Sequence, residues 1–201
     1  MISNYDQELA RLIQSLYPND YVHASFLPKP HHGSGPIKAI VIGADPTFFQ
    51  DGINGTVDKV FGLEQPDSQF FRGVLTNLEQ IDLSLDTICV QNPVKNYFTT
   101  ETSQNKIWSK CASLWLENLK RELDEKFDRS VPMFVTAEII LKVVVFREYL
   151  KGIKNPDIYH RNIIFSPKQN YFGRKVIPLF RHFNYQLSAW PDYADFIKEQ
   201  L

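Results

Sequence analysis

The sequence predicts an α/β protein, built as a three-layer α/β/α sandwich around a central four-stranded parallel sheet. Short apolar runs alternate with longer amphipathic stretches, which is typical of a parallel sheet covered by helices on both faces. The runs are rich in Ile and Val, as expected of strands buried on both sides. The chain has 201 residues, of which 43% are hydrophobic, and this is enough for one domain. We expect a single domain over residues 1–201, with an N-terminal helix and loop over 1–36 and the core over 37–190.

Four apolar runs are the predicted strands. The first covers residues 37–42, where five of the six residues are Ala, Ile or Val, and it ends at Gly43. This near-continuous pattern distinguishes a fully buried strand from a half-buried one, in which polar residues alternate. The other three runs are similarly short, and they cover residues 87–91, 131–136 and 175–180.

Helices are predicted where apolar residues recur at helical spacing. The expected ranges are 6–16, 68–81, 104–127, a segment that follows the third strand through about 150, and 193–201. The helix over 104–127 is expected to bury Trp108, Cys111, Leu114, Trp115, Leu119 and Leu123. Pro and Gly crowd residues 28–36, so we expect a loop there. The adjacent His31 and His32 in that loop do not by themselves make a metal site.

Composition limits the class of protein. No stretch reaches the roughly 18 apolar residues of a membrane span, and the start lacks the basic and then apolar segments of a secretory signal. Cys89 and Cys111 are the only cysteines, too few for an iron–sulfur cluster or a four-cysteine zinc site. We therefore expect a cytoplasmic protein with no structural metal.

The charge is distributed unevenly. The net charge of −1 argues against a strongly nucleic-acid-binding protein. Residues 142–181, however, hold nine basic residues against Glu148 and Asp157, which gives +7 there and −8 elsewhere. This asymmetry indicates a basic face on an acidic body. The alternative is an ordinary set of solvated lysines and arginines.

Four side chains are predicted near strand ends: Asp45, Phe61, Asn92 and His182. In open α/β sheets, ligands bind beyond the carboxyl ends of the strands. An aromatic ring can stack on a flat heterocycle, a carboxamide can match a pyrimidine edge, and an imidazole can stabilise a departing base. A carboxylate can orient water or balance a cationic sugar. The alternative for Asp45 is a turn or helix cap.

The motifs around these residues resemble those of the uracil-DNA glycosylase superfamily. They are, in order, Gly43-Ala44-Asp45-Pro46, Val60-Phe61-Gly62, Val90-Gln91-Asn92-Pro93-Val94-Lys95 and Pro178-Leu179-Phe180-Arg181-His182. The resemblance implies a hydrolase of base excision repair, which removes uracil or a related damaged base from DNA on an α/β/α sandwich. It implies no metal or organic cofactor. We expect a monomer that binds DNA and no membrane.

The resemblance also implies roles for individual residues. Asp45 would position the attacking water, and His182 would stabilise the leaving uracil anion. The predicted substrate-binding residues are Gly43, Ala44, Thr47, Phe61 and Asn92. The predicted DNA-binding residues are Arg174, Lys175, Arg181 and Asn184, because the basic segment leads directly into His182.

The sequence departs from the family pattern at two places. Thr47 stands where the most familiar branch has a tyrosine that rejects thymine, and Phe183-Asn184 stands where it has Pro-Ser. These departures favour an alternative, a catalytically inactive nucleic-acid or nucleobase-binding protein on the same fold. A hydrolase of free nucleosides is a third reading.

Overall fold

The computed structural model describes residues 4–23, 27–44, 46, 48–50, 53–55, 57–63 and 69–201. Its central sheet joins, in spatial order, β2 (His31–His32), β6 (Ile88–Gln91), β3 (Ala39–Ile42), β8 (Met133–Val135) and β9 (Val176–Pro178). The last four of these strands are parallel, whereas β2 is antiparallel to β6. The α/β class is confirmed, and each parallel strand lies within a predicted range.

The fifth strand, β2, is a difference from the prediction, because residues 28–36 were expected to form a loop. His31 pairs with Val90 and His32 with Cys89 along the edge of the sheet. Two polar residues show neither an apolar run nor a period-2 alternation, so pattern analysis has no signal for such a short edge strand. Its position comes from pairing with β6 and not from its own sequence.

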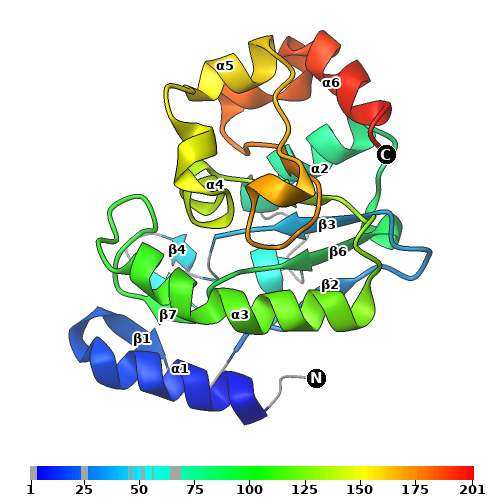
Figure 1. The fold of residues 1–201 in the computed structure, drawn as a ribbon. Coiled ribbons are helices and arrows are strands. Elements are labelled where there is room, and N and C mark those ends of the chain that lie inside the picture. Colours follow the sequence, from blue (N-terminus) through cyan, green and yellow to red (C-terminus); the bar gives the residue numbers. More distant parts are fainter. Residues whose placement is uncertain are drawn as a thin grey trace.

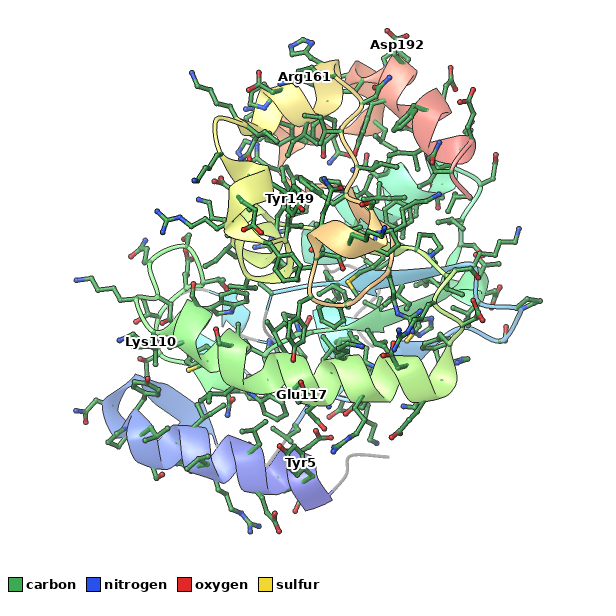
Figure 2. The ribbon with its side chains drawn as sticks, viewed as in Figure 1. Tyr5, Lys110, Glu117, Tyr149, Arg161 and Asp192 are labelled. Atoms are coloured by element: carbon green, nitrogen blue, oxygen red, sulfur yellow. The ribbon has the colours of Figure 1, made fainter. Side chains whose placement is uncertain are left out.

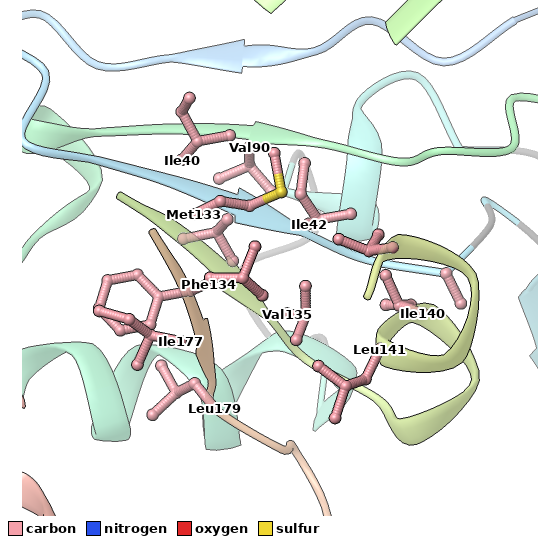
Figure 3. Close-up of a cluster of buried hydrophobic side chains, with 14 of the residues drawn as sticks. Ile40, Ile42, Val90, Met133, Phe134, Val135, Ile140, Leu141, Ile177 and Leu179 are labelled. Carbon is pink, nitrogen blue, oxygen red and sulfur yellow. The ribbon is translucent and has the colours of Figure 1, made fainter. Parts of the chain in front are cut away.

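The core is built on the rows of residues that the parallel register aligns. Val41 lies beside Val90 on one side and Phe134 on the other, and Phe134 lies beside Ile177. These four side chains are fully buried, and Figure 3 shows Val90, Phe134 and Ile177 together with Leu141 from the following helix. Burial on both faces therefore explains why these strands are apolar at every position.

Helices lie on both sides of the strands as drawn in Figure 1, with α3 below them and α4, α5 and α6 above. Among the described residues, none of the helices is long and apolar enough to cross a membrane. The helices are α1 (Asn4–Leu16), α2 (Gln69–Gln80), α3 (Trp108–Lys126), α4 (Glu138–Val144), α5 (Asn155–His160) and α6 (Pro191–Lys198). Two small antiparallel pairs accompany them, β1 (Tyr21–His23) with β7 (Tyr97–Phe98) and β4 (Phe48–Gln50) with β5 (Ile53–Gly55).

Three helix predictions need correction. Helix α3 begins at Trp108 and not at 104, because the Asn105 side chain accepts a hydrogen bond from the Ile107 amide and closes a turn there. Leu114 was expected inside but is 40% exposed. Helix α4 ends at Val144, since Val145 is extended, and residues 147–150 form a separate 3₁₀ turn. Helix α5 was not predicted.

A buried charged cluster fixes the segment that follows β6. The ammonium of Lys95 lies 3.0 Å from Asp6 of α1 and 2.7 Å from Glu122 of α3. Asn118 of α3 also donates a hydrogen bond to Asp6. Both Asp6 and Lys95 are less than 10% exposed, so these contacts are only weakly screened by solvent. They anchor the chain three residues beyond Asn92.

An aromatic cluster in the same way fixes the segment that follows β9. The ring of Tyr159 lies 4.6 Å from that of Tyr193 and 6.0 Å from that of Phe180. The Phe180 amide donates to the Tyr159 hydroxyl, and the Tyr193 hydroxyl donates to the Pro178 carbonyl. Helices α5 and α6 thus hold the backbone that leads to His182.

Stability is expected to fall at alkaline pH because three buried groups resist ionisation. Burial raises the pKa of Cys89 to about 12 and raises the pKa of Tyr159 and Tyr193 above the ordinary tyrosine value. In the unfolded chain these groups ionise near pH 8.5 and 10. The stabilisation is therefore complete below about pH 8 and is lost as the pH rises, by about 1.4 kcal/mol per pH unit for each ionising group.

Urea unfolding at a series of pH values between about 7 and 11 measures this slope. Tyr193→Phe should reduce the slope above about pH 10, because phenylalanine cannot ionise. A free energy of unfolding that is constant across this range would contradict the assignment.

Candidate functional site

The carboxyl ends of the parallel strands meet at one edge of the sheet. Backbone hydrogen bonds continue the ladder beyond the strand ends: the Gly43 amide donates to Gln91, Thr136 to Ile42, and Arg181 to Thr136. The Thr136 hydroxyl also donates to the Ile42 carbonyl at 2.9 Å. As a result, the segments after β6, β3, β8 and β9 lie in a fixed row.

Three of the predicted site residues come together at Gly43. A methyl group placed on the Gly43 Cα would lie 2.5 Å from Oδ1 of Asn92 and 2.5 Å from Cζ of Phe61. Real side-chain carbons do not approach this closely, so only glycine allows both side chains to pack there. Gly43, Phe61 and Asn92 therefore lie side by side, whereas their binding of a substrate stays a prediction.

The Asn92 carboxamide is buried without full hydrogen bonding. Asn92 is 2% exposed, and its Nδ2 has no hydrogen-bond partner in the described part of the chain. An unsatisfied buried polar group of this kind costs about 1–3 kcal/mol. Native proteins pair nearly all such groups, and Asn92 is one of six side chains within the described ranges that hold a buried polar atom without a partner.

Phe61 is held in an unusual backbone conformation. Its φ of 62° is left-handed, and Gly62 that follows has a φ of 64°. For a residue with a Cβ this conformation costs about 1–2 kcal/mol. The Val60 amide donates to Lys29 and the Gly62 amide donates to Lys59, which fixes the turn on both sides. Strain of this kind is concentrated at functional sites, and here it turns the ring toward Gly43.

His182 lies at the mouth of a neighbouring cavity of about 370 Å³. Its Nδ1 accepts a hydrogen bond from the Asn184 amide at 3.3 Å, so a neutral ring carries its proton on Nε2 and presents a donor there. The ring lies 4.3 Å from that of Phe183, which is 75% exposed. The cavity is lined by Thr136, Ala137, Glu138, Asn155, Phe180, Arg181, His182, Asn184 and Tyr185.

The site residues therefore form two adjoining groups. Gly43, Phe61 and Asn92 make one group, and the cavity at His182 makes the other. Thr136 connects them, because it donates to Ile42 of β3 and accepts from Arg181 after β9. Thr136 was not among the predicted site residues. It ends the predicted third strand, and this position was the signal that could have placed Thr136 at the carboxyl ends of the strands.

Of the other predicted site residues near Gly43, the structure describes Ala44 but neither Asp45 nor Thr47. Ala44 is 7% exposed and packs in the core beside Gly43. Asp45 and Thr47 lie outside the described residues, so their predicted roles remain predictions.

The predicted phosphate contact of Arg174 is wrong. Its side chain is fully buried, and its guanidinium donates to the carbonyls of Leu123, Phe127 and Asp128 at the end of α3. Lys175 is half-buried and donates to Gln200. Both residues precede β9 and therefore lie at the amino ends of the parallel strands, whereas Gly43 lies at their carboxyl ends. Arg181 and Asn184, in contrast, line the cavity beside His182.

Basic side chains that the predictions did not select gather between α4 and α5. Arg147, Lys151 and Lys154 are exposed there, together with Phe146 and Tyr149 at 41% and 38% exposure. We call this segment the basic turn (residues 146–154), and Figure 2 labels Tyr149 within it. The positive net charge of residues 142–181 indicated this part of the chain. Charge alone could not distinguish these exposed basic residues from the buried Arg174.

The basic turn adjoins the cavity through hydrogen bonds at its end. Asn155 donates to Glu138 at 2.7 Å, and both residues line the cavity. The ammonium of Lys142 lies 2.5 Å from Glu138. Hydrogen bonds from Lys142 and Asn155 hold the pKa of Glu138 below its ordinary value, so this carboxylate at the rim is ionised and already paired.

No group of three His, Cys, Asp or Glu side chains with a geometry suited to a metal ion occurs within the described ranges. A comparison of the chain with protein-family models and with curated proteins finds no match.

Proposed function

We propose that this protein is a DNA glycosylase that hydrolyses the N-glycosidic bond of uracil or a related damaged base flipped out of DNA, on a three-layer α/β/α sandwich. The observation that supports the proposal is the buried Asn92 carboxamide, which lies with the Phe61 ring at Gly43 and whose Nδ2 has no hydrogen-bond partner among the residues that the structure describes. Uracil presents carbonyl acceptors and an N–H donor along one edge, which a carboxamide can match. A flat base stacked on Phe61 would satisfy the amide.

The other groups of the proposed mechanism follow from the same edge. His182, with its proton on Nε2, supplies a donor where negative charge develops on the leaving base. The cavity beside His182 gives access from the surface. Asp45 is the proposed acid that orients water, and this role comes from the sequence motif. Base extrusion is required because the glycosidic bond of a stacked base is out of reach.

The DNA strand is proposed to approach over the basic turn. Arg147, Lys151 and Lys154 would contact phosphates, and the exposed Tyr149 ring would stack on an unpaired base. Glu138 and Asn155 connect this turn to the cavity at His182. The strand would thus reach the base pocket from the side of α4 and α5.

The direct test uses single- and double-stranded oligonucleotides that contain one uracil, followed by alkaline cleavage at abasic sites. Strand breaks at the uracil position are expected, and Asp45→Asn should lower the rate by orders of magnitude without affecting folding. No product from uracil, hypoxanthine or thymine-mismatch substrates would overturn the proposal. Binding of DNA without any product would favour the inactive binding protein, which Thr47 and Phe183-Asn184 suggest.

The contribution of the basic turn is tested by the double variant Arg147→Ser/Lys151→Ser. Binding of single-stranded DNA should weaken, and the slope of log K against log salt should become shallower by about 1 to 2, because each phosphate contact contributes about 0.7. Lys110→Ser is the control, since Lys110 is exposed on α3, away from the basic turn (Figure 2). An unchanged slope in the double variant would exclude this path.

A further inference from the structure

A second cavity, of about 630 Å³, lies at the β2 edge of the sheet and shares no lining residue with the candidate site. Its volume is within the range of cavities that hold small ligands. It is lined by Lys29, Pro30, His31, His32, Cys89, Gln91 and Lys126. The adjacent His31 and His32 thus line a cavity, and the proposed glycosylase makes no use of them.

The walls of this cavity are basic. Lys29 precedes β2 and Lys126 ends α3, so the two ammonium groups come from different segments of the chain. No Asp or Glu is among the described residues that line the cavity. Glu122, the acid that acts on nearby Cys89, is already paired with Lys95 at 2.7 Å. The positive charge in the cavity is therefore uncompensated by its own lining.

The cysteine of the cavity lining is neutral, and hydrogen bonds fix the orientation of the two histidine rings. Cys89 is 2% exposed, and burial raises the pKa of its thiol to about 12, so it carries no charge at neutral pH. Nε2 of His31 lies 2.9 Å from the Leu85 carbonyl, and Nδ1 of His32 lies 2.9 Å from the Gly33 carbonyl. A carbonyl only accepts, so each of these ring nitrogens carries a proton. The His32 ring also stacks on Phe127.

We propose that this cavity binds the phosphate group of a small organic anion of about mononucleotide size. A lysine ammonium is a compact point charge that binds phosphate well, and two of them at one cavity can share a dianion. The Gln91 carboxamide at the floor supplies a further polar group, and the volume leaves room for the organic part.

The test is isothermal titration calorimetry of the full chain with three probes: adenosine 5′-monophosphate, inorganic phosphate and adenosine. Adenosine monophosphate and phosphate are expected to bind, and uncharged adenosine is expected not to bind. Lys29→Ser and Lys126→Ser should each weaken binding of the monophosphate by about tenfold or more, the equivalent of one charge-assisted contact.

Lys110→Ser is the matched control, because it removes the same charge from the exposed start of α3 (Figure 2), and it should bind as the unmodified protein does. Equal binding by Lys29→Ser, Lys126→Ser and Lys110→Ser would overturn the proposal. Loss of binding in Arg147→Ser/Lys151→Ser alone would also overturn it, since the anion would then occupy the basic turn. None of these outcomes depends on glycosylase activity.

Discussion

Arg174→Ala is expected to lower the free energy of unfolding by about 3–5 kcal/mol, as is usual when one member of a buried ion pair is removed. The guanidinium donates to three carbonyls at the end of α3 and lies 3.0 Å from Asp124. The last carbonyls of a helix have no partners within the helix. Alanine would remove all of these side-chain hydrogen bonds, although the Leu123 and Asp128 carbonyls each keep one from a backbone amide. It would also leave a space the size of the arginine side chain.

Arg129→Ala is the control for this measurement. Arg129 also pairs with Asp124 at 3.0 Å, but its side chain is 66% exposed, so its loss should cost less than about 1 kcal/mol. Arg174→Lys should give an intermediate loss, because one ammonium cannot reproduce the forked geometry of the guanidinium. Urea unfolding measures all three. Equal stability of Arg174→Ala and the unmodified protein would show that these contacts carry little energy.

Arg174 also shows where sequence reasoning fails. It stands between Gly173 and the basic Lys175 in a segment rich in basic residues, and a solvated, phosphate-binding arginine was the simplest expectation. Its partners are 46 to 51 residues away, at the end of α3. Nothing in the local pattern reveals that the carbonyls of a helix terminus pack against it. The burial of a charge is a property of tertiary structure, so charge counts alone could not identify it.

The parallel strands were predictable for the opposite reason. A strand buried on both faces needs apolar residues at nearly every position. Short apolar runs such as residues 37–42 meet that requirement and can be recognised in the sequence. The site was predictable to the extent that it follows from the sheet: the carboxyl ends of parallel strands share an edge, which brings Gly43 and Asn92 together. The left-handed backbone of Phe61, which brings its ring to Gly43, has no such signal in the sequence.

Asn92→Leu is expected to abolish activity and, at the same time, to stabilise the protein. In the proposed glycosylase the carboxamide donates to the base, and loss of one such transition-state contact lowers rates by about 100- to 1000-fold. Leucine has a similar shape and removes a buried amide whose Nδ2 is unpartnered within the described ranges. The free energy of unfolding should therefore rise by about 1 kcal/mol. Cleavage of uracil-containing DNA and urea unfolding measure the two effects.

Asn96→Leu is the matched control, because it makes the same change four residues away at a site that is also fully buried. The Asn96 carboxamide accepts from the Trp115 indole at 2.7 Å and donates to the Ala10 carbonyl at 3.4 Å. Its replacement leaves that indole unpaired and should cost about 1–3 kcal/mol. The opposite signs separate a residue kept for binding from one kept for folding. If Asn92→Leu were destabilised to the same extent as Asn96→Leu, the Asn92 side chain would be a structural turn residue, and the base pocket would lose its main support.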